Sequence, residues 1–151
     1  MLRSQLTDAL KQAMRGRDET AVSTLRLILA ALKDRDIAAR GSGNADGIDD
    51  AQILDMLGKM VKQRRESIAL YEQGGRLDLA EREQREIDII KQFLPEQLDE
   101  GETAEAVDAT IREIGAASIK DMGRLMAELR ARYAGRMDFA KASAMAKQKL
   151  S

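Results

Sequence analysis

The side chains of this 151-residue chain that could do chemistry are carboxylates, ammonium and guanidinium groups and hydroxyls, because the sequence contains neither cysteine nor histidine. This absence excludes thiol nucleophiles, disulfides, histidine-based triads, haem ligation and the usual zinc and iron–sulfur sites. A metal site would have to be built from carboxylates alone, which suit magnesium or calcium. The sequence also lacks a glycine-rich phosphate-binding loop. We therefore predict no catalytic residue, no cofactor and no bound metal.

Three charged residues fall on helix faces that are otherwise apolar. Arg64 lies in the middle of the apolar stripe of one predicted helix, and Glu83 and Glu86 lie within the stripe of the next. In an antiparallel hairpin folded at Gly75, positions 64 and 86 are equally far from the turn, so they face each other. We predict an Arg64–Glu86 pair. It is either a partly buried bridge that fixes hairpin register, which we favour, or a polar site that recognises an anionic ligand.

Basic residues gather in the C-terminal third of the chain. Residues 118–151 carry a net charge of +5, enough to meet several phosphates of a nucleic acid. The candidate tRNA-binding residues are Lys120, Arg124, Arg130, Arg132, Arg136 and Lys141. Because aromatic residues make up only 3% of the chain, recognition would rest on backbone and shape rather than on base stacking. The alternative, which stays open, is that this basic face packs on residues 96–113, whose net charge is −6.

A second basic group lies on the outer side of the predicted helical hairpin. Its members are Lys59, Lys62, Arg65 and Arg76. The alternative is ordinary solvated helix charge, interleaved with Glu66 and Glu72, so this group is only a secondary candidate.

Composition and periodicity predict that these side chains stand on an all-α fold. Hydrophobic residues make up 44% of the chain and charged residues 34%, with a single proline. Apolar residues recur at helical spacing in seven segments, and no alternating strand pattern is present. The expected helices cover about residues 2–14, 19–37, 50–73, 77–93, 100–114, 119–134 and 139–150, with a flexible loop over residues 41–47.

The single proline marks the expected domain boundary. Leu94-Pro95 ends the fourth helix, because proline cannot continue the hydrogen-bond ladder, and the charge pattern changes directly after it. We predict an N-terminal bundle of about four helices over residues 1–94 and a small three-helix domain over residues 95–151. With no apolar run of membrane-spanning length and no signal peptide, we expect a cytoplasmic protein that contacts no membrane.

Four stretches of the sequence resemble the YqeY family, whose sequence corresponds to the C-terminal helical part of GatB, the B subunit of tRNA-dependent amidotransferase. They cover residues 24–33, 62–76, 86–98 and 115–123 and follow each other in the family's order. The all-helical, two-part architecture that the resemblance implies agrees with the break at Pro95. It also implies that residues 95–151 are similar to the GatB tail.

The resemblance links the chain to carbon–nitrogen ligase activity with glutamine as amido-N-donor. In GatB that chemistry belongs to a separate catalytic region, which needs magnesium and receives ammonia from a glutaminase subunit, and nothing in this sequence resembles that region. The resemblance therefore implies a tRNA-binding or amidotransferase-associated module without its own catalytic centre, with tRNA, an amidotransferase or another translation component as partner. Two alternatives stay open: a protein–protein adaptor of the translation machinery, and an enzyme that works through carboxylates such as Glu83, Glu86 and Asp121.

Overall fold

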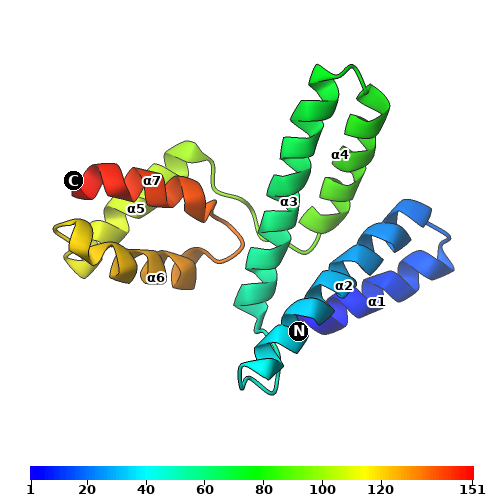
Figure 1. Ribbon diagram of the computed structural model, residues 1–151, viewed down its shortest axis with the longest axis horizontal. Coiled ribbons are helices and arrows are strands. Elements are labelled where there is room, and N and C mark those ends of the chain that lie inside the picture. Colours follow the sequence, from blue (N-terminus) through cyan, green and yellow to red (C-terminus); the bar gives the residue numbers. More distant parts are fainter. The chain divides into compact units, whose positions relative to one another are not determined.

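The structure, a computed structural model, describes all residues 1–151 and is entirely helical (Figure 1). The predicted all-α class is therefore confirmed. The helices are α1 (Leu2–Arg15), α2 (Glu19–Gly41), α3 (Asp50–Gln73), α4 (Leu77–Lys91), α5 (Glu100–Ile114), a short 3-10 helix η1 (Ile119–Asp121), α6 (Met122–Tyr133) and α7 (Phe139–Leu150). The α2 helix continues to Gly41 beyond the predicted end near Ile37, because Ala38, Ala39 and Arg40 are good helix formers.

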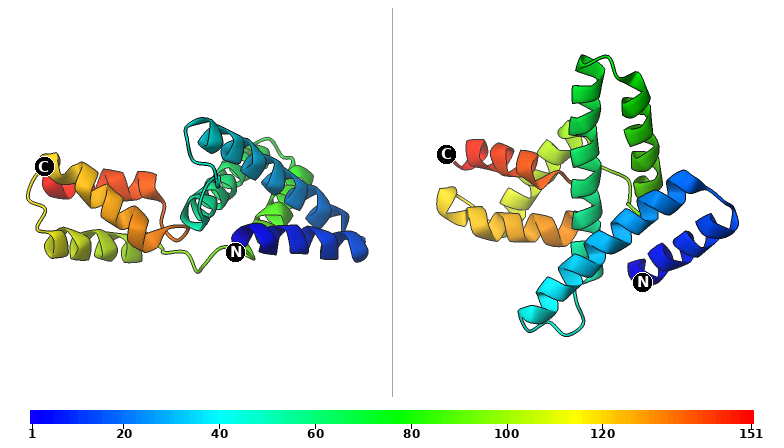
Figure 2. Two further views of the ribbon diagram at one scale, coloured as in Figure 1. Left: turned by 90° about the horizontal axis from the view of Figure 1, so that it is seen from below. Right: turned by 45° about the vertical axis from the view of Figure 1, so that its right-hand side comes forward.

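The chain divides into two compact units, Met1–Leu94 and Pro95–Ser151, each with its own hydrophobic core. The N-terminal unit is a four-helix bundle of two hairpins. In the first, α1 packs along α2, and in the second, α3 packs along α4 (Figures 1 and 2). Its core consists of fully buried side chains from all four helices, including Leu6, Ile28, Ile53, Leu57, Ile87 and Ile90. Burial of each such side chain contributes about 1.5–3 kcal/mol.

Short side chains fix where the helices begin. Asp18 accepts a hydrogen bond from the amide of Ala21, and Asp138 accepts one from Ala140. Asp49 and Asp99 form full capping boxes with the residue three positions later. Each cap satisfies an amide that has no partner inside the helix and is worth about 1 kcal/mol. The capping box of Asp49 thereby determines the residue at which α3, the first helix of the α3–α4 hairpin, begins.

The C-terminal unit packs α5, α6 and α7 around Val107, Leu125, Leu129, Ala142 and Ala146. Gly115 ends α5 in the left-handed conformation, with φ at 68°, which allows the chain to turn into η1. The amide of Leu98 donates to the carbonyl of Arg136 at 2.8 Å and so fixes the segment before α5 to the turn before α7. None of the helices in either unit combines the length and the apolar character needed to cross a bilayer.

Candidate nucleic-acid interface

The C-terminal unit pairs many of its cations with its own acids. Arg132 of α6 contacts both Glu113 of α5 and Glu128 of its own helix, and Lys141 Nζ of α7 lies 3.2 Å from Glu100 Oε1 of α5. A further ion pair connects α7 to α5 through residues 149 and 108. Arg132 and Lys141 are thus engaged with the acidic α5 helix, as the alternative interpretation of the basic cluster expects for them.

Arg136 is also engaged within the unit. Its Nε donates to the carbonyl oxygen of Glu96 at 3.1 Å, across the turn that precedes α7. Gln97 donates from its side-chain amide to the carbonyls of Pro95 and Gly135 in the same region. Arg136 therefore helps to hold the start of the C-terminal unit, and its side chain is only partly exposed.

The remaining three candidates lie on the outward side of η1 and α6. Lys120, Arg124 and Arg130 are all exposed, and at 100° per residue they fall on the side of the helix opposite the buried Leu125 and Leu129. The positions between them carry only small residues, namely Gly123, Ala127 and Ala131, and these are exposed as well. We call this surface, defined by Lys120, Gly123, Arg124, Ala127, Arg130 and Ala131, the α6 outer face.

The charges on the α6 outer face differ in their surroundings. Lys120 and Arg130 form no ion pair with an acid, and the Arg130 guanidinium lies 5.4 Å from the centroid of the Phe139 ring. Arg124 Nη2 lies 3.2 Å from Asp121 Oδ1, and its Nη1 donates to the carbonyl of Ile114 at 2.8 Å. Lys120 and Arg130 are therefore the two cations of this face that are most available to a polyanion.

The amides that precede η1 are already occupied by Asp121. Its Oδ2 accepts from the amides of Ala117 at 2.8 Å and Ser118 at 3.2 Å. These backbone bonds, followed by the bond from Arg124, hold the pKa of Asp121 below its ordinary value. A phosphate that meets this end of the helix would therefore have to be bound by side chains rather than by these two amides.

The secondary basic group is spread along the α3–α4 hairpin. Lys59 Nζ lies 3.1 Å from Asp55 Oδ2 one turn earlier, and Lys62 and Arg65 are exposed on the following turns of α3. Arg76 lies beyond the end of α3, in the turn before α4, where it forms a two-bond contact with Asp78 at 3.2 Å. The structure thus places Arg76 apart from the other three and does not gather the four into one cluster.

Arg64 lies between two carboxylates inside the hairpin. Its Nε is 3.0 Å from Glu86 Oε2 and 4.0 Å from Glu83 Oε2, and its Nη1 donates to the carbonyl of Met60 at 3.2 Å. The side chains of Arg64 and Glu86 are only 12% and 15% exposed. Because the guanidinium is already bound by groups of the hairpin, this geometry supports the structural bridge over an anion-binding site.

Glu83 is the carboxylate of this cluster whose ionised form is disfavoured. Burial raises its pKa, the neighbouring Glu86 raises it further, and Arg64 offsets only part of the effect. The pKa of Glu83 therefore lies above its ordinary value, which means that the folded protein holds a proton there more readily than the unfolded chain.

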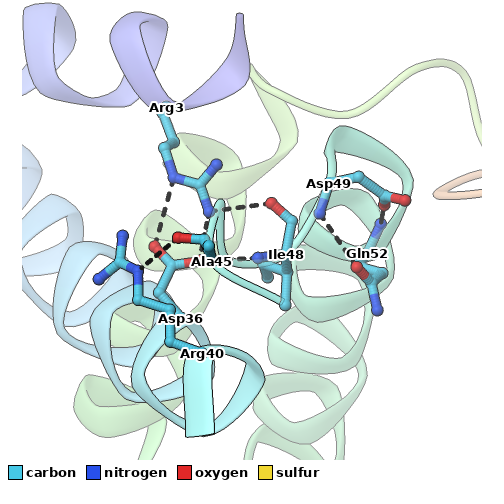
Figure 3. A network of polar contacts seen from close by, with 7 residues as sticks. All are labelled: Arg3, Asp36, Arg40, Ala45, Ile48, Asp49 and Gln52. Atoms are coloured by element: carbon cyan, nitrogen blue, oxygen red, sulfur yellow. Dashed lines mark hydrogen bonds and ion pairs between the residues drawn. The ribbon is translucent and has the colours of Figure 1, made fainter. Parts of the chain in front are cut away.

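A second buried charge, which we did not predict from the sequence, lies where α1, α2 and the loop before α3 meet (Figure 3). Asp36 of α2 is only 7% exposed and accepts hydrogen bonds from Arg3 of α1 and from the amide of Ile48 at 2.9 Å. Arg3 also donates to the carbonyl of Ile48 at 2.9 Å. We call this set of contacts the Arg3–Asp36 clasp. It ties the start of α1 and the end of α2 to the loop that enters α3.

The loop is shaped to fit this clasp. Gly47 adopts φ of 79°, and a Cβ at this position would overlap the Asp36 carboxylate. Burial raises the pKa of Asp36, but the hydrogen bonds from Arg3 and Ile48 more than offset it, so this pKa lies below its ordinary value. A signal was available in the sequence, because Asp36 falls on the buried side of α2 with Leu32, as Arg64 does on α3.

Carboxylates do not converge into a metal site anywhere in the chain, since no group of three or more aspartates and glutamates is arranged to hold an ion. The paired acids Glu83 and Glu86 face the guanidinium of Arg64. The carboxylates that we considered as catalytic groups from the sequence thus take part in ion pairs.

Comparison with known proteins decides the family. The model of the Yqey-like protein family matches residues 3–150. The chain belongs to the YqeY-like family. This confirms the resemblance seen in the four sequence stretches, and it places both units of this YqeY-like chain within one family pattern.

Relatives of this YqeY-like chain occur in yeasts under the name altered inheritance of mitochondria protein 41, mitochondrial. The protein from Lachancea thermotolerans is 34% identical over 111 residues, which cover 74% of this chain and 56% of the relative. The proteins from Saccharomyces cerevisiae and Eremothecium gossypii are 36% and 35% identical over 91 residues, which cover 60% of this chain and 47% and 48% of those relatives. The matched region thus spans about half of each relative.

Proposed function

We propose that this YqeY-like chain is a helical accessory module that binds tRNA through the α6 outer face and has no catalytic centre of its own. The observation that carries the proposal is the make-up of that face, where Lys120, Arg124 and Arg130 stand exposed with only glycine and alanine between them. Small residues let a sugar–phosphate backbone approach the helix closely, and the cations at the edges then meet its phosphates.

The pairing pattern inside the C-terminal unit supports the same choice of surface. Arg132 and Lys141 are held by acids of α5, and Arg136 is held by a backbone carbonyl. On the α6 outer face only Arg124 is paired with an acid, Asp121, so Lys120 and Arg130 keep their charge free of an ion pair. Tyr133 and Phe139 are partly buried in the core of the unit, so recognition would depend on the phosphate backbone rather than on stacked bases.

The link to amidotransferases and to other translation components is part of this proposal and rests on the family resemblance. In this view the module would act beside an enzyme that performs glutamine-dependent amidation, while contributing tRNA contacts rather than chemistry. The compartment that we propose for it is the cytoplasm, where its tRNA partner is available.

The test compares two charge reversals of equal size in the full chain. One double variant, Lys120→Glu with Arg130→Glu, reverses the two unpaired cations of the α6 outer face. The control variant, Lys59→Glu with Arg65→Glu, changes the net charge of the chain by the same amount but on α3. Binding of fluorescently labelled tRNA is measured by anisotropy at one fixed salt concentration. We expect a loss of about tenfold or more for the α6 pair and a much smaller loss for the α3 pair.

Three outcomes would contradict the proposal. Equal losses from both pairs would show diffuse attraction to the whole protein rather than a binding face. An unchanged affinity in the α6 variant, or an absence of tRNA binding by the unmodified chain, would leave the protein–protein adaptor as the better account.

A further inference from the structure

The exposed side of α2, in the N-terminal unit, carries a pattern that belongs to helix pairing. Leu27, Ala30, Asp34 and Ile37 follow each other at intervals of three, four and three residues, which is the seam spacing of a coiled coil. Leu27 and Ile37 are 51% and 56% exposed, although both are large and apolar. Within its own unit, therefore, this seam has no helix packed over it.

Cations flank this seam at regular intervals. Arg26, Lys33 and Arg40 are spaced seven residues apart, so they lie on one edge of the seam about 10.5 Å from each other. All three are exposed, and Arg26 and Lys33 form no ion pair with an acid, whereas Arg40 donates from its Nε to the carbonyl of Ala45 at 3.2 Å and helps to lower the pKa of Asp36 (Figure 3). If the seam residues are the a and d positions of a heptad, these three cations occupy the g positions. Charged residues at g positions determine which partner helix can pair. We call the seam and these cations together the α2 docking face.

We infer that the α2 docking face binds an amphipathic helix of a partner protein, whose apolar stripe is flanked by acidic residues at heptad spacing. The apolar side chains of that stripe would cover Leu27 and Ile37, and the acids would meet Arg26, Lys33 and Arg40. This surface lies in the other unit from the proposed tRNA-binding face, so the inference goes beyond the proposed function and does not depend on it.

Apolar residues in the seam favour a protein over a nucleic acid as the occupant. A phosphate backbone would neutralise the cations but would offer nothing to cover Leu27 and Ile37. A second copy of this chain fits poorly for the opposite reason. Antiparallel pairing of two α2 helices would set cations against cations, and parallel pairing would set them against Ala31 and Ala38, which carry no charge.

Asp34 is an unfavourable residue for helix pairing at this face. It occupies the middle of the seam and would be covered by a bound helix, which costs free energy unless the partner offers a cation or a hydrogen-bond donor there. A partner helix with apolar residues throughout its stripe should therefore bind weakly to the natural chain. Replacement of Asp34 by leucine should strengthen that binding.

The experiment uses two labelled 21-residue peptides that differ only in charge. Both have three heptads with leucine at the seam positions, and they carry either glutamate or lysine at the e and g positions. Like charges keep each peptide from pairing with itself. We expect the full chain to bind the glutamate peptide at least about tenfold more tightly than the lysine peptide, as measured by anisotropy.

Variants make the test specific to α2. The triple change Arg26→Glu, Lys33→Glu and Arg40→Glu should reverse the preference between the two peptides, and Asp34→Leu should tighten the glutamate peptide about tenfold or more. The matched control, Lys11→Glu with Arg85→Glu and Lys91→Glu, reverses three exposed cations elsewhere in the same unit and should leave the preference intact.

Three results would overturn the inference. They are equal binding of the two peptides, an unchanged preference in the triple variant, and no gain from Asp34→Leu. Loss of tRNA binding in the triple variant with unchanged peptide binding would assign the face to nucleic acid instead. Because tRNA binding is tested with α6 variants, a failure of either proposal leaves the other standing.

Discussion

Arg64 of α3 and Glu86 of α4 meet across the helical hairpin, with the guanidinium Nε 3.0 Å from the carboxylate Oε2. Each residue is eleven positions from Gly75, so the contact exists only if the two helices pair in one register. A shift of either helix by one residue would turn one of the two charges away from its partner. The ion pair thereby favours one alignment over its neighbours, which an apolar pair would do less strictly.

Removal of Arg64 should therefore be costly, and the cost should depend on what replaces it. Arg64→Ala leaves a cavity and an unpaired carboxylate and should lower the free energy of unfolding by about 3 kcal/mol. Arg64→Met restores the volume and should cost less, and Arg64→Met with Glu86→Leu should recover most of the loss. Urea unfolding provides the measurement, with the exposed Arg65→Ala as control. Equal stability of Arg64→Ala and Arg65→Ala would refute the bridge.

Glu83 should behave in the opposite way to a stabilising charge. Because its pKa is raised in the folded protein, the ionised form costs stability at neutral pH, and this cost disappears as the pH falls through the raised pKa. Glu83→Gln should therefore stabilise the chain at pH 7 by less than about 1 kcal/mol, and the gain should shrink as the pH falls through the raised pKa of Glu83. Thermal unfolding of both proteins as the pH is lowered measures it. A Glu83→Gln variant that is less stable at pH 7 would contradict the account.

The Arg3–Asp36 clasp predicts acid sensitivity. The pKa of Asp36 is lowered in the folded protein, so its contribution is complete above the ordinary carboxyl value of about 3.9 and is lost as the pH falls through the lowered pKa. Asp36→Asn should destabilise the chain at pH 7 by about 2 kcal/mol, because Arg3 loses its counter-charge while the site stays filled. Unfolding free energies of the two proteins should converge as the pH falls below the ordinary carboxyl value of about 3.9 and through the lowered pKa of Asp36. A difference that stays constant as the pH falls would argue against the clasp.

These residues also show what the sequence could and could not predict. The Arg64–Glu86 pair was predictable because its partners lie symmetrically about a single glycine turn, so helix geometry alone brings them together. The Arg3–Asp36 clasp was not found, because its partners are separated by 33 residues and meet through an irregular loop at Gly47. The net charge of residues 118–151 could be read from the sequence. The cations that pair with Glu100 and Glu113 could not, because they depend on how α5 packs, and hydrophobic periodicity does not predict this packing.

The purified chain should show no glutaminase, ATPase or amidotransferase activity. It has no cysteine or histidine, and the acids Glu83, Glu86 and Asp121 are held by arginines or backbone amides. Ammonia release from glutamine, measured with and without ATP and tRNA, should equal that of buffer. Activity that persists through further purification and is abolished by Glu86→Gln or Asp121→Asn would show that the chain is an enzyme.

The salt dependence of tRNA binding tests the central claim most directly. A plot of log affinity against log salt concentration should be linear and steep for the unmodified chain, because each phosphate contact releases counterions. In the Lys120→Glu and Arg130→Glu variant the slope should become shallower by about two, one for each lost contact. The Lys59→Glu and Arg65→Glu variant should keep the slope of the unmodified chain. An identical slope in all three proteins, or binding that does not respond to salt, would contradict tRNA recognition by the α6 outer face.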